Sequence, residues 1–145
     1  MATRSAHTSW TGGIQDGSGR VTLTSSGAGT FDVSFPKRTA ENADGTTSPE
    51  ELIGAAHSAC YSMALSGGIA RAGGTPLGLE VDAAVTLGPD PAGGLYISSI
   101  VLTVVGRVEG LDAEGFQRAA EEAKAGCPVS KALAATNISL VASLA

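Results

Sequence analysis

The residues of this chain best suited to chemistry are its two cysteines. Cys60 lies in the small, apolar stretch HSACYSMAL, and Cys127 follows 67 residues later in KAGCPVSKAL. Two thiols at this separation allow three interpretations: they fill the core, they contribute to a metal site, or they form a redox pair. A thiol is a nucleophile only as a thiolate, so the surroundings of each sulfur decide between these interpretations.

The local sequences of the two cysteines have different implications. A cysteine on the apolar face of a helix is usually a small hydrophobic residue, and this is the simplest interpretation of Cys60. Cys127 precedes a proline and is placed to cap a helix. At such a position free backbone N–H groups and the helix dipole lower the pKa of a thiol. This placement gives a redox role more support at Cys127 than at Cys60, and a structural turn residue remains the alternative.

A zinc site has less support. His57 and Cys60 are three residues apart, as on one helical face, and Cys127 is a third candidate ligand. Zinc usually takes three or four protein ligands, and no fourth candidate stands out. Neither C-x-x-C nor H-x-x-x-H occurs. We therefore predict no metal and no bound cofactor.

Length and composition indicate the class of protein. The chain has 145 residues and a net charge of −5, which predicts one domain over residues 1–145. It has no long apolar segment, no signal-like N-terminus and no basic stretch. These features predict a soluble cytoplasmic protein that binds neither membrane nor nucleic acid. In that reducing compartment, a pair of cysteines is more often catalytic or redox-sensing than structural.

The elements that would position the thiols begin with strands. Alternating polar and apolar residues predict three strands in the first third of the chain, with Phe31, Val33 and Phe35 on one face. Residues 37–47 lack an apolar face and predict an exposed loop.

A long helix should carry Cys60. Ser48 as N-cap, Pro49 at the first position and Glu51 three residues after the cap are the start signals of a helix, which Gly73 would end. The predicted inward face consists of small and apolar residues: Leu52, Ala55, Ala56, Ala59, Cys60, Met63 and Ala64. This composition predicts a central, buried helix against which another backbone packs closely.

The remaining sequence completes an α+β domain. Residues 77–108 predict a hairpin of two strands around the loop GPDPAGG. Asp112 should cap an amphipathic helix whose inward residues are Phe116, Ala119, Ala120 and Ala123. A short helix follows Cys127, and residues 136–144 predict a last strand.

The two cysteine segments carry a family resemblance. SPEELIGAAHSACYSMAL followed by AKAGCPVSKAL resembles the osmotically inducible protein C (OsmC) family, relatives of the organic hydroperoxide resistance proteins. The resemblance covers nearly the whole chain, and AAH-x-AC and CPVS are closer to the OsmC branch. It implies an OsmC-like fold, with antiparallel sheets packed on a long central helix in an intertwined homodimer. It also implies a thiol-dependent peroxidase of oxidative and osmotic stress defence, acting mainly on organic hydroperoxides and less well on hydrogen peroxide.

The resemblance further implies roles for individual residues. Cys60 would attack the peroxide and become a sulfenic acid, and Cys127 would condense with it into a disulfide that a lipoyl group or another external thiol reduces. Arg38 in FPKR, held by Glu50 in PEEL, would offset the rise in the pKa of a buried Cys60. Arg20 is the alternative arginine.

Helix geometry adds an expectation about assembly. Glu50 and Cys60 are ten residues apart, or about 15 Å along a helix that rises about 1.5 Å per residue. A carboxylate in the first turn does not easily reach Cys60 of its own chain, so we expect Arg38 and Glu50 to come from a partner chain. His57, one turn before Cys60, is interpreted as a packing residue or an indirect support.

Other functions remain open from the residues alone. A protein of the same fold without turnover would bind or store a small molecule. For the peroxidase, Met63, Phe35 and the helix glycines are candidates for the lining of an apolar pocket around the organic tail, with core packing as the alternative. A thiol–disulfide oxidoreductase acting on proteins is a further alternative, although such enzymes usually carry C-x-x-C. The natural hydroperoxide and the natural reductant do not follow from the sequence.

Overall fold

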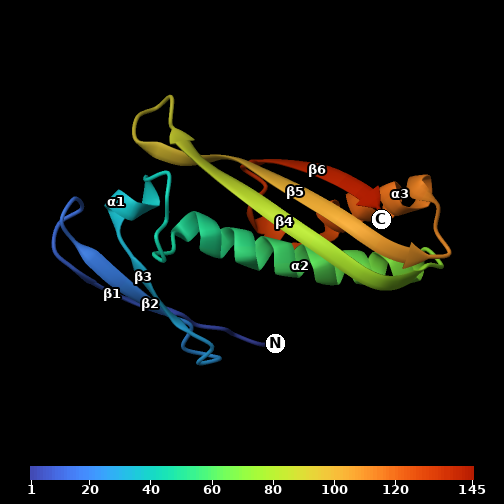
Figure 1. The fold of residues 1–145 in the computed structure, drawn as a ribbon, viewed down its shortest axis with the longest axis horizontal. Coiled ribbons are helices and arrows are strands. Elements are labelled where there is room, and N and C mark those ends of the chain that lie inside the picture. The colour runs from blue at the N-terminus through green and yellow to red at the C-terminus, as the bar shows by residue number, and fades with distance from the viewer. The chain divides into compact units, whose positions relative to one another are not determined.

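The order of the elements follows the predicted order, with one addition. The computed structural model describes residues 1–145. Its elements are β1 (His7–Thr11), β2 (Ser18–Thr22), β3 (Thr30–Val33), α1 (Phe35–Arg38), α2 (Pro49–Arg71), β4 (Thr75–Pro89), β5 (Leu95–Glu109), α3 (Ala113–Gly126), α4 (Pro128–Ala132) and β6 (Asn137–Leu144) (Figure 1). They form two compact units, Met1–Leu52 and Ile53–Ala145. None of the helices combines the length and the apolarity that crossing a membrane requires.

The first unit contains a three-stranded antiparallel sheet in the order β1-β2-β3. One prediction for this unit was wrong, because Phe35 is not a strand residue. The strand ends at Val33, and Ser34 caps the short helix α1, accepting a hydrogen bond from the backbone N–H of Lys37 at 3.3 Å. Pro36 lies in the first turn of α1, where its fixed φ favours a helix and its missing N–H costs nothing.

Helix α2 begins and ends where the sequence predicts. The Ser48 hydroxyl accepts a hydrogen bond from the backbone N–H of Glu51 at 3.1 Å, as expected of an N-cap. The reciprocal half of a capping box is absent, because the carboxylate of Glu51 accepts a hydrogen bond from Thr47. Gly73 ends the helix with a φ of +88°, a conformation that glycine adopts without steric cost.

The face of α2 that is buried differs from the predicted one. The buried residues at helical spacing are Gly54, His57, Tyr61, Leu65, Gly68 and Ile69. Of the predicted inward residues, Ala55, Ala56, Ala59 and Met63 are exposed in the single chain, and Met63 exposes 75% of its surface. Tyr61, Leu65 and Ile69 bury more apolar area in the core than the alanines of the predicted face would. A close backbone approach occurs at Gly54, where a Cβ would lie 2.9 Å from the carbonyl oxygen of Ala83.

The second unit has a three-stranded sheet in the order β4-β5-β6. Strands β4 and β5 form the predicted long antiparallel hairpin. Strand β6 runs parallel to β5, so the expectation of purely antiparallel sheets was wrong for this pair. The chain between β5 and β6 contains α3 and α4, and a crossover through helices is the usual way to join parallel neighbours.

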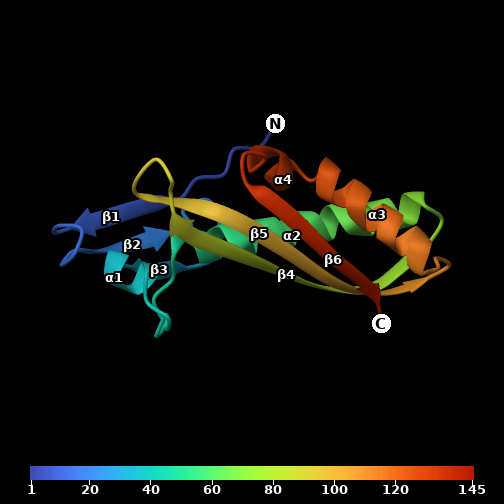
Figure 2. The ribbon, with the colours of Figure 1, turned by 90° about the horizontal axis from the view of Figure 1, so that it is seen from above.

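The core of the second unit lies between this sheet and two helices. Helices α2 and α3 lie side by side, and the Tyr61 hydroxyl of α2 donates a hydrogen bond to the Ala120 carbonyl of α3 at 3.1 Å (Figure 2). The buried cluster contains Tyr61, Leu65 and Ile69 of α2, Leu102 and Val104 of β5, Phe116, Ala119, Ala120 and Ala123 of α3, and Cys127. The predicted inward face of α3 and its cap at Asp112 are therefore confirmed.

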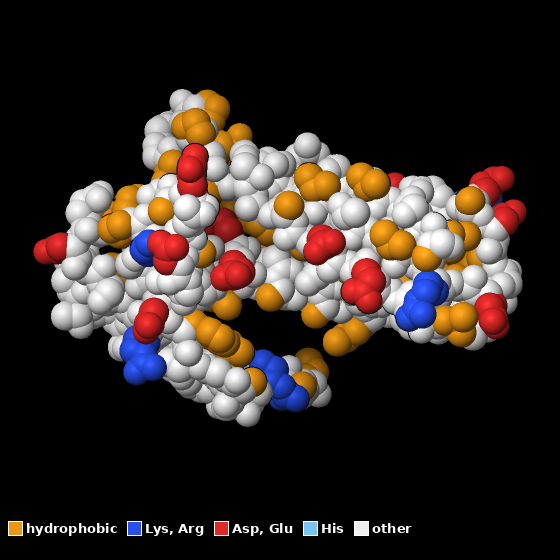
Figure 3. Space-filling model, viewed as in Figure 1, with side chains coloured by type: hydrophobic (Ala, Val, Ile, Leu, Met, Phe, Trp, Pro, Cys, Tyr) orange, Lys and Arg blue, Asp and Glu red, His pale blue; other side chains and the backbone are white.

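The face of the molecule in Figure 3 carries acidic side chains at several separate places. The Lys and Arg side chains on this face do not form a cluster. Hydrophobic side chains also reach this surface in scattered positions. This distribution accords with the net charge of −5.

Phe116 offers a test of the core. Its ring is 1% exposed and lies so close to β5 that a Cβ on Gly106 would approach it to 2.6 Å. We expect Phe116→Ala to lower the free energy of unfolding by about 3–5 kcal/mol, because it removes a buried ring and leaves a cavity. Urea denaturation measures the loss. Phe31→Ala, at a site that is 39% exposed, is the control and should cost less than about 1 kcal/mol. Equal losses for the two variants would contradict the assigned core.

Candidate active site

The two cysteines meet inside the second unit. Cys60 lies in the middle of α2, and Cys127 lies between α3 and α4 as the N-cap residue of α4. Their sulfur atoms are 3.2 Å apart, within hydrogen-bonding distance, and neither is in a disulfide. A disulfide bond is about 2.05 Å long, so a small movement of the side chains is enough to form one.

The two thiols differ in access. Cys127 is completely buried, whereas Cys60 is only partly buried. A molecule approaching the pair therefore meets the sulfur of Cys60 first.

The two thiols also differ in acidity. Burial raises the pKa of Cys60, and the neighbouring Cys127 sulfur adds to that rise. Burial opposes ionisation of Cys127 too, but the backbone N–H groups of Ser130 and Val129 and the side chains of Cys60 and Ser130 outweigh it. The pKa of Cys127 is therefore lowered, which confirms the effect expected of a thiol at a helix N-cap. In the single chain no cationic side chain contributes to the pKa of Cys60.

Arg38 and Glu50 meet inside the first unit. Nη2 of Arg38 lies 2.6 Å from Oε1 of Glu50, and Nε lies 3.1 Å from both carboxylate oxygens. Glu50 is buried, and burial alone would raise the pKa of its carboxyl group. The hydrogen bonds and charge of Arg38 outweigh that effect, so the pKa of Glu50 is lowered. This contact also raises the pKa of Arg38 and holds its guanidinium group in one orientation.

The neighbouring basic residues have different surroundings. Arg20 on β2 pairs with Asp32 on β3 at 3.4 Å, and both side chains are about 70% exposed. Lys37 pairs with Asp44 in the loop after α1. Among these three basic side chains, Arg38 alone has a buried carboxylate as its partner.

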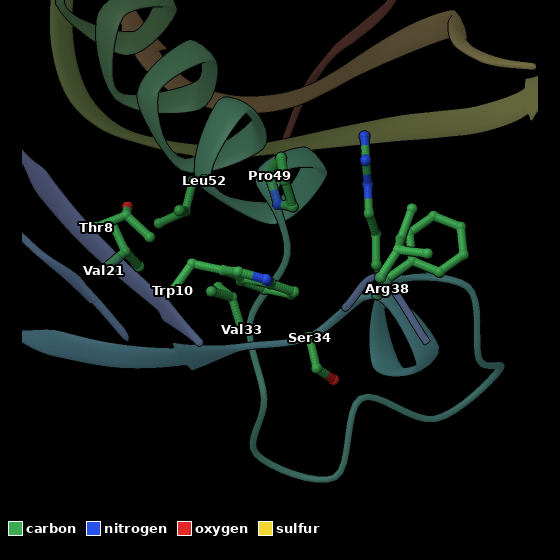
Figure 4. A pocket seen from close by; sticks show the side chains of 10 residues that line it. Thr8, Trp10, Val21, Val33, Ser34, Arg38, Pro49 and Leu52 are labelled. Carbon is green, nitrogen blue, oxygen red and sulfur yellow. The ribbon is translucent and has the colours of Figure 1, made fainter. Parts of the chain in front are cut away.

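A mostly apolar pocket of about 420 Å³ lies beside Arg38 in the first unit. Side chains of β1, β2 and β3, including Trp10, Val21 and Val33, line it together with Leu52 from the start of α2 (Figure 4). Phe35, a predicted pocket residue, also lines it, whereas Met63 does not.

His57 contacts a serine that the sequence analysis did not single out. Its Nε2 lies 2.7 Å from the hydroxyl of Ser130 on α4, and both side chains are buried. His57 therefore bonds to a residue beside Cys127 and not to Cys60. The CPVS motif, with serine three residues after a capping cysteine, was the signal that could have identified Ser130. No group of three or more His, Cys, Asp and Glu side chains is arranged to hold a metal ion.

Comparison with known proteins places the chain in a family. A family model described as OsmC-like protein matches residues 41–141. The chain belongs to the OsmC-like family. Peroxiredoxin OsmC of Escherichia coli strain K12 is 44% identical over 126 residues, which are 87% of this OsmC-like chain and 86% of that protein.

Solved structures of related proteins share the fold of this OsmC-like chain. An organic hydroperoxide resistance protein from Elizabethkingia anophelis superposes with a TM-score of 0.76 at 29% identity, over 100% of this chain and 96% of that one. The organic hydroperoxide resistance protein OhrB of Bacillus subtilis superposes with a TM-score of 0.71 at 29% identity, over 97% and 98% of the two chains. The predicted α+β, OsmC-like fold is thus confirmed. The residues matched by the family model include Glu50, Cys60 and Cys127, while Arg38 lies before them.

Proposed function

We propose that this protein is a two-cysteine thiol peroxidase that reduces organic hydroperoxides to alcohols, with residues 1–145 acting as one OsmC-like domain. The observation that carries the proposal is the pair of free thiols 3.2 Å apart, one partly accessible and one buried. The relationship to a peroxiredoxin at 44% identity supports a peroxiredoxin-like enzyme of hydroperoxide defence. The names of the structural relatives support organic hydroperoxides as the substrate class.

The reaction assigns a separate step to each sulfur. The Cys60 thiolate attacks the distal oxygen of the hydroperoxide, the O–O bond breaks, and the alkoxide takes a proton to leave as the alcohol. Cys60 is then a sulfenic acid. The Cys127 thiolate attacks that sulfur, the S–O bond breaks, and hydroxide leaves and is protonated to water. An external dithiol, such as a lipoyl group, reduces the resulting Cys60–Cys127 disulfide.

The order of the two cysteines follows from their access and their acidity. Cys60 is the sulfur that a hydroperoxide meets first, since Cys127 is completely buried. The raised pKa of Cys60 means that its thiolate needs a cation nearby. We assign that role to Arg38, whose guanidinium group Glu50 orients.

We further propose that the cation comes from a second copy of the chain in a homodimer. Glu50 precedes Cys60 by ten residues of a continuous helix, a rise of about 15 Å. The exposed face of α2 carries the small residues Ala55, Ala56 and Ala59 and the large apolar Met63, and it supports an interface at which another backbone comes close. In such a dimer each site combines the two cysteines of one chain with Arg38 and Glu50 of the other.

The pocket beside Arg38 supports an organic substrate. Its lining of Trp10, Val21, Val33 and Phe35 would favour an alkyl or aryl tail over water. We therefore expect cumene hydroperoxide to be a better substrate than hydrogen peroxide.

Turnover tests the proposed function directly. Purified protein is mixed with cumene hydroperoxide and dihydrolipoamide, hydroperoxide loss is followed over time, and the thiols are counted before and after the hydroperoxide is added. We expect catalytic consumption and the loss of two thiols per chain in the absence of reductant. No consumption and two unchanged thiols would contradict the peroxidase. Saturable binding of the hydroperoxide without turnover would then indicate a small-molecule binding protein of the same fold.

A further inference from the structure

Two contacts join helix α2 to the segment that contains Cys127 and helix α4, and they are one helical turn apart. The sulfurs of Cys60 and Cys127 are 3.2 Å apart, and the Nε2 atom of His57 lies 2.7 Å from the hydroxyl of Ser130. His57 comes three residues before Cys60, and Ser130 comes three residues after Cys127. The two segments therefore run in opposite directions here, with the two contacts separated by about 4.5 Å along α2.

The contact between His57 and Ser130 is enclosed by the protein. His57 has no exposed surface, and Ser130 exposes only 7% of its surface. The other ring nitrogen of His57, Nδ1, is buried without a hydrogen-bond partner. A buried polar atom without a partner costs free energy, so an apolar side chain would fill this space at a lower cost. Packing alone therefore does not account for a histidine at this position.

The contact does not depend on the state of the ring or of the thiols. A neutral ring either donates from Nε2 to the serine oxygen or accepts the serine hydrogen at Nε2, and a protonated ring donates from Nε2. Oxidation of the two cysteines changes neither the imidazole nor the hydroxyl. The contact is thus available in every step of a cycle between free thiols and a disulfide.

Helix α4 is too short to hold its own position. It has five residues, Pro128–Ala132, and a helix of about one turn is marginal without tertiary contacts. Val129 packs against the core, but apolar burial is non-directional and does not fix the rotation of α4 or its position along α2. A hydrogen bond is directional. The contact with His57 therefore fixes the place of α4 on α2, and with it the place of Cys127.

We propose that His57 and Ser130 form a clamp that keeps Cys127 within reach of Cys60 throughout the reaction cycle. The inference rests on the proposed function, and both are positioning residues. After Cys60 becomes a sulfenic acid, the Cys127 thiolate attacks its sulfur, the S–S bond forms, the S–O bond breaks, and hydroxide leaves and is protonated to water. The clamp raises the local concentration of the attacking sulfur, so this step precedes oxidation of Cys60 to a sulfinic acid by a second hydroperoxide.

The stability of the disulfide tests the clamp without any hydroperoxide. The protein is equilibrated in redox buffers of glutathione or dithiothreitol, and the disulfide fraction is measured by mass after alkylation of free thiols. Without the clamp, forming the bond must also order α4, and ordering the backbone of one residue corresponds to about a tenfold change in an equilibrium constant. We expect Ser130→Ala and His57→Leu each to lower the equilibrium constant for disulfide formation about tenfold, which raises the reduction potential by about 30 mV.

Two comparisons separate a clamp from a general loss of stability. Ser130→Thr keeps the hydroxyl and His57→Gln keeps a side-chain hydrogen-bonding group, so both should restore most of the parent potential. Because each residue acts through the other, the double variant His57→Leu/Ser130→Ala should shift the potential no further than either single variant. Additive shifts in the double variant would overturn the clamp.

The matched control is Tyr61→Phe. Tyr61 is next to Cys60 on α2, and its buried hydroxyl donates to the Ala120 carbonyl of α3 at 3.1 Å. The variant removes a buried hydrogen bond of α2 without removing one to α4, so it should lower the thermal stability and leave the reduction potential unchanged. Equal shifts in potential for Tyr61→Phe and Ser130→Ala would overturn the inference, as would a Ser130→Ala protein with the parent potential.

Treatment with a hydroperoxide separates this inference from the proposed function. In excess cumene hydroperoxide, Ser130→Ala should accumulate several-fold more Cys60 sulfinic acid than the parent protein, as seen by intact mass, and equal amounts would contradict the clamp. If the parent forms the disulfide in the redox buffer but not with the hydroperoxide, the peroxidase proposal fails, while a shifted potential still supports the clamp. If the parent turns over hydroperoxide and the variants keep its potential, the clamp alone is overturned. Thiols that pair under neither condition would overturn both.

Discussion

Replacing Cys60 with serine is expected to lower hydroperoxide turnover by about 10³-fold or more, to the background rate, as when other enzymes lose their nucleophile. The serine hydroxyl has nearly the same size as the thiol but is not ionised at neutral pH, so it does not attack the peroxide oxygen. Because Cys60 is only partly buried, the fold should be retained. The measurement is steady-state consumption of cumene hydroperoxide with dihydrolipoamide, together with a thermal unfolding curve that checks the fold.

Cys127→Ser is the matched comparison, because it removes the partner sulfur at 3.2 Å and keeps the first nucleophile. It should consume one equivalent of hydroperoxide rapidly, leave a Cys60 sulfenic acid that dimedone traps, and then over-oxidise. The opposite pattern, with a first equivalent consumed by Cys60→Ser and not by Cys127→Ser, would make Cys127 the peroxide-reactive residue. That result would reverse the order we infer from their access to solvent.

The sequence predicts those features that a few neighbouring residues determine. The start of α2 at Ser48 and Pro49 and its end at Gly73 depend on local backbone hydrogen bonds and on the φ of one glycine. The place of Cys127 at the start of α4 has the same local origin. Its lowered pKa is partly local, through Val129 and Ser130, and partly due to the distant Cys60.

Other features depend on contacts between distant segments, and these were missed. Both faces of α2 carry small and apolar residues, so periodicity alone does not reveal that Tyr61 and Leu65 face the core while Ala59 and Met63 do not. The parallel direction of β6 depends on where α3 and α4 return the chain to the sheet. The contact between His57 and Ser130 joins residues 73 positions apart, and neither residue carries a local signal for the other.

The contact between Arg38 and Glu50 joins two residues that the sequence analysis named together, and this contact supports the proposal of Arg38 over Arg20. Arg38 and Glu50 are 12 residues apart, and the FPKR and PEEL segments that hold them are recognisable in the sequence. The contact of Arg20 with Asp32 is largely exposed, and such a pair is weak in water. An arginine held by a buried carboxylate keeps its orientation, which a group that must stabilise a thiolate requires.

Arg38→Met should therefore lower turnover by about 10²–10³-fold, the usual effect of removing one group that stabilises charge in the reaction. Its cause should be a higher pKa of Cys60, so raising the pH should recover part of the rate. Arg38→Lys keeps the positive charge but should restore only part of the turnover rate. An ammonium group does not reproduce the planar contact that the guanidinium group makes with Glu50. Arg20→Met is the control and should retain most of the activity. A larger loss in Arg20→Met than in Arg38→Met would exchange their roles.

Hybrids of the proposed homodimer test which chain supplies Arg38 to the proposed site. Cys60→Ser and Arg38→Met chains, both inactive alone, are co-expressed with different tags, and the hybrid is isolated through both tags. If Arg38 acts on the partner's thiol, one of its two sites is intact, and the hybrid should have about half of the activity of the parent dimer. If Arg38 acts within its own chain, the hybrid has no intact site and stays inactive.

The control hybrid combines Cys60→Ser with Cys127→Ser. It should not turn over, because the two sulfurs 3.2 Å apart belong to one chain. Activity in the first hybrid and not in the second would establish a site built from the thiols of one chain and the arginine of the other.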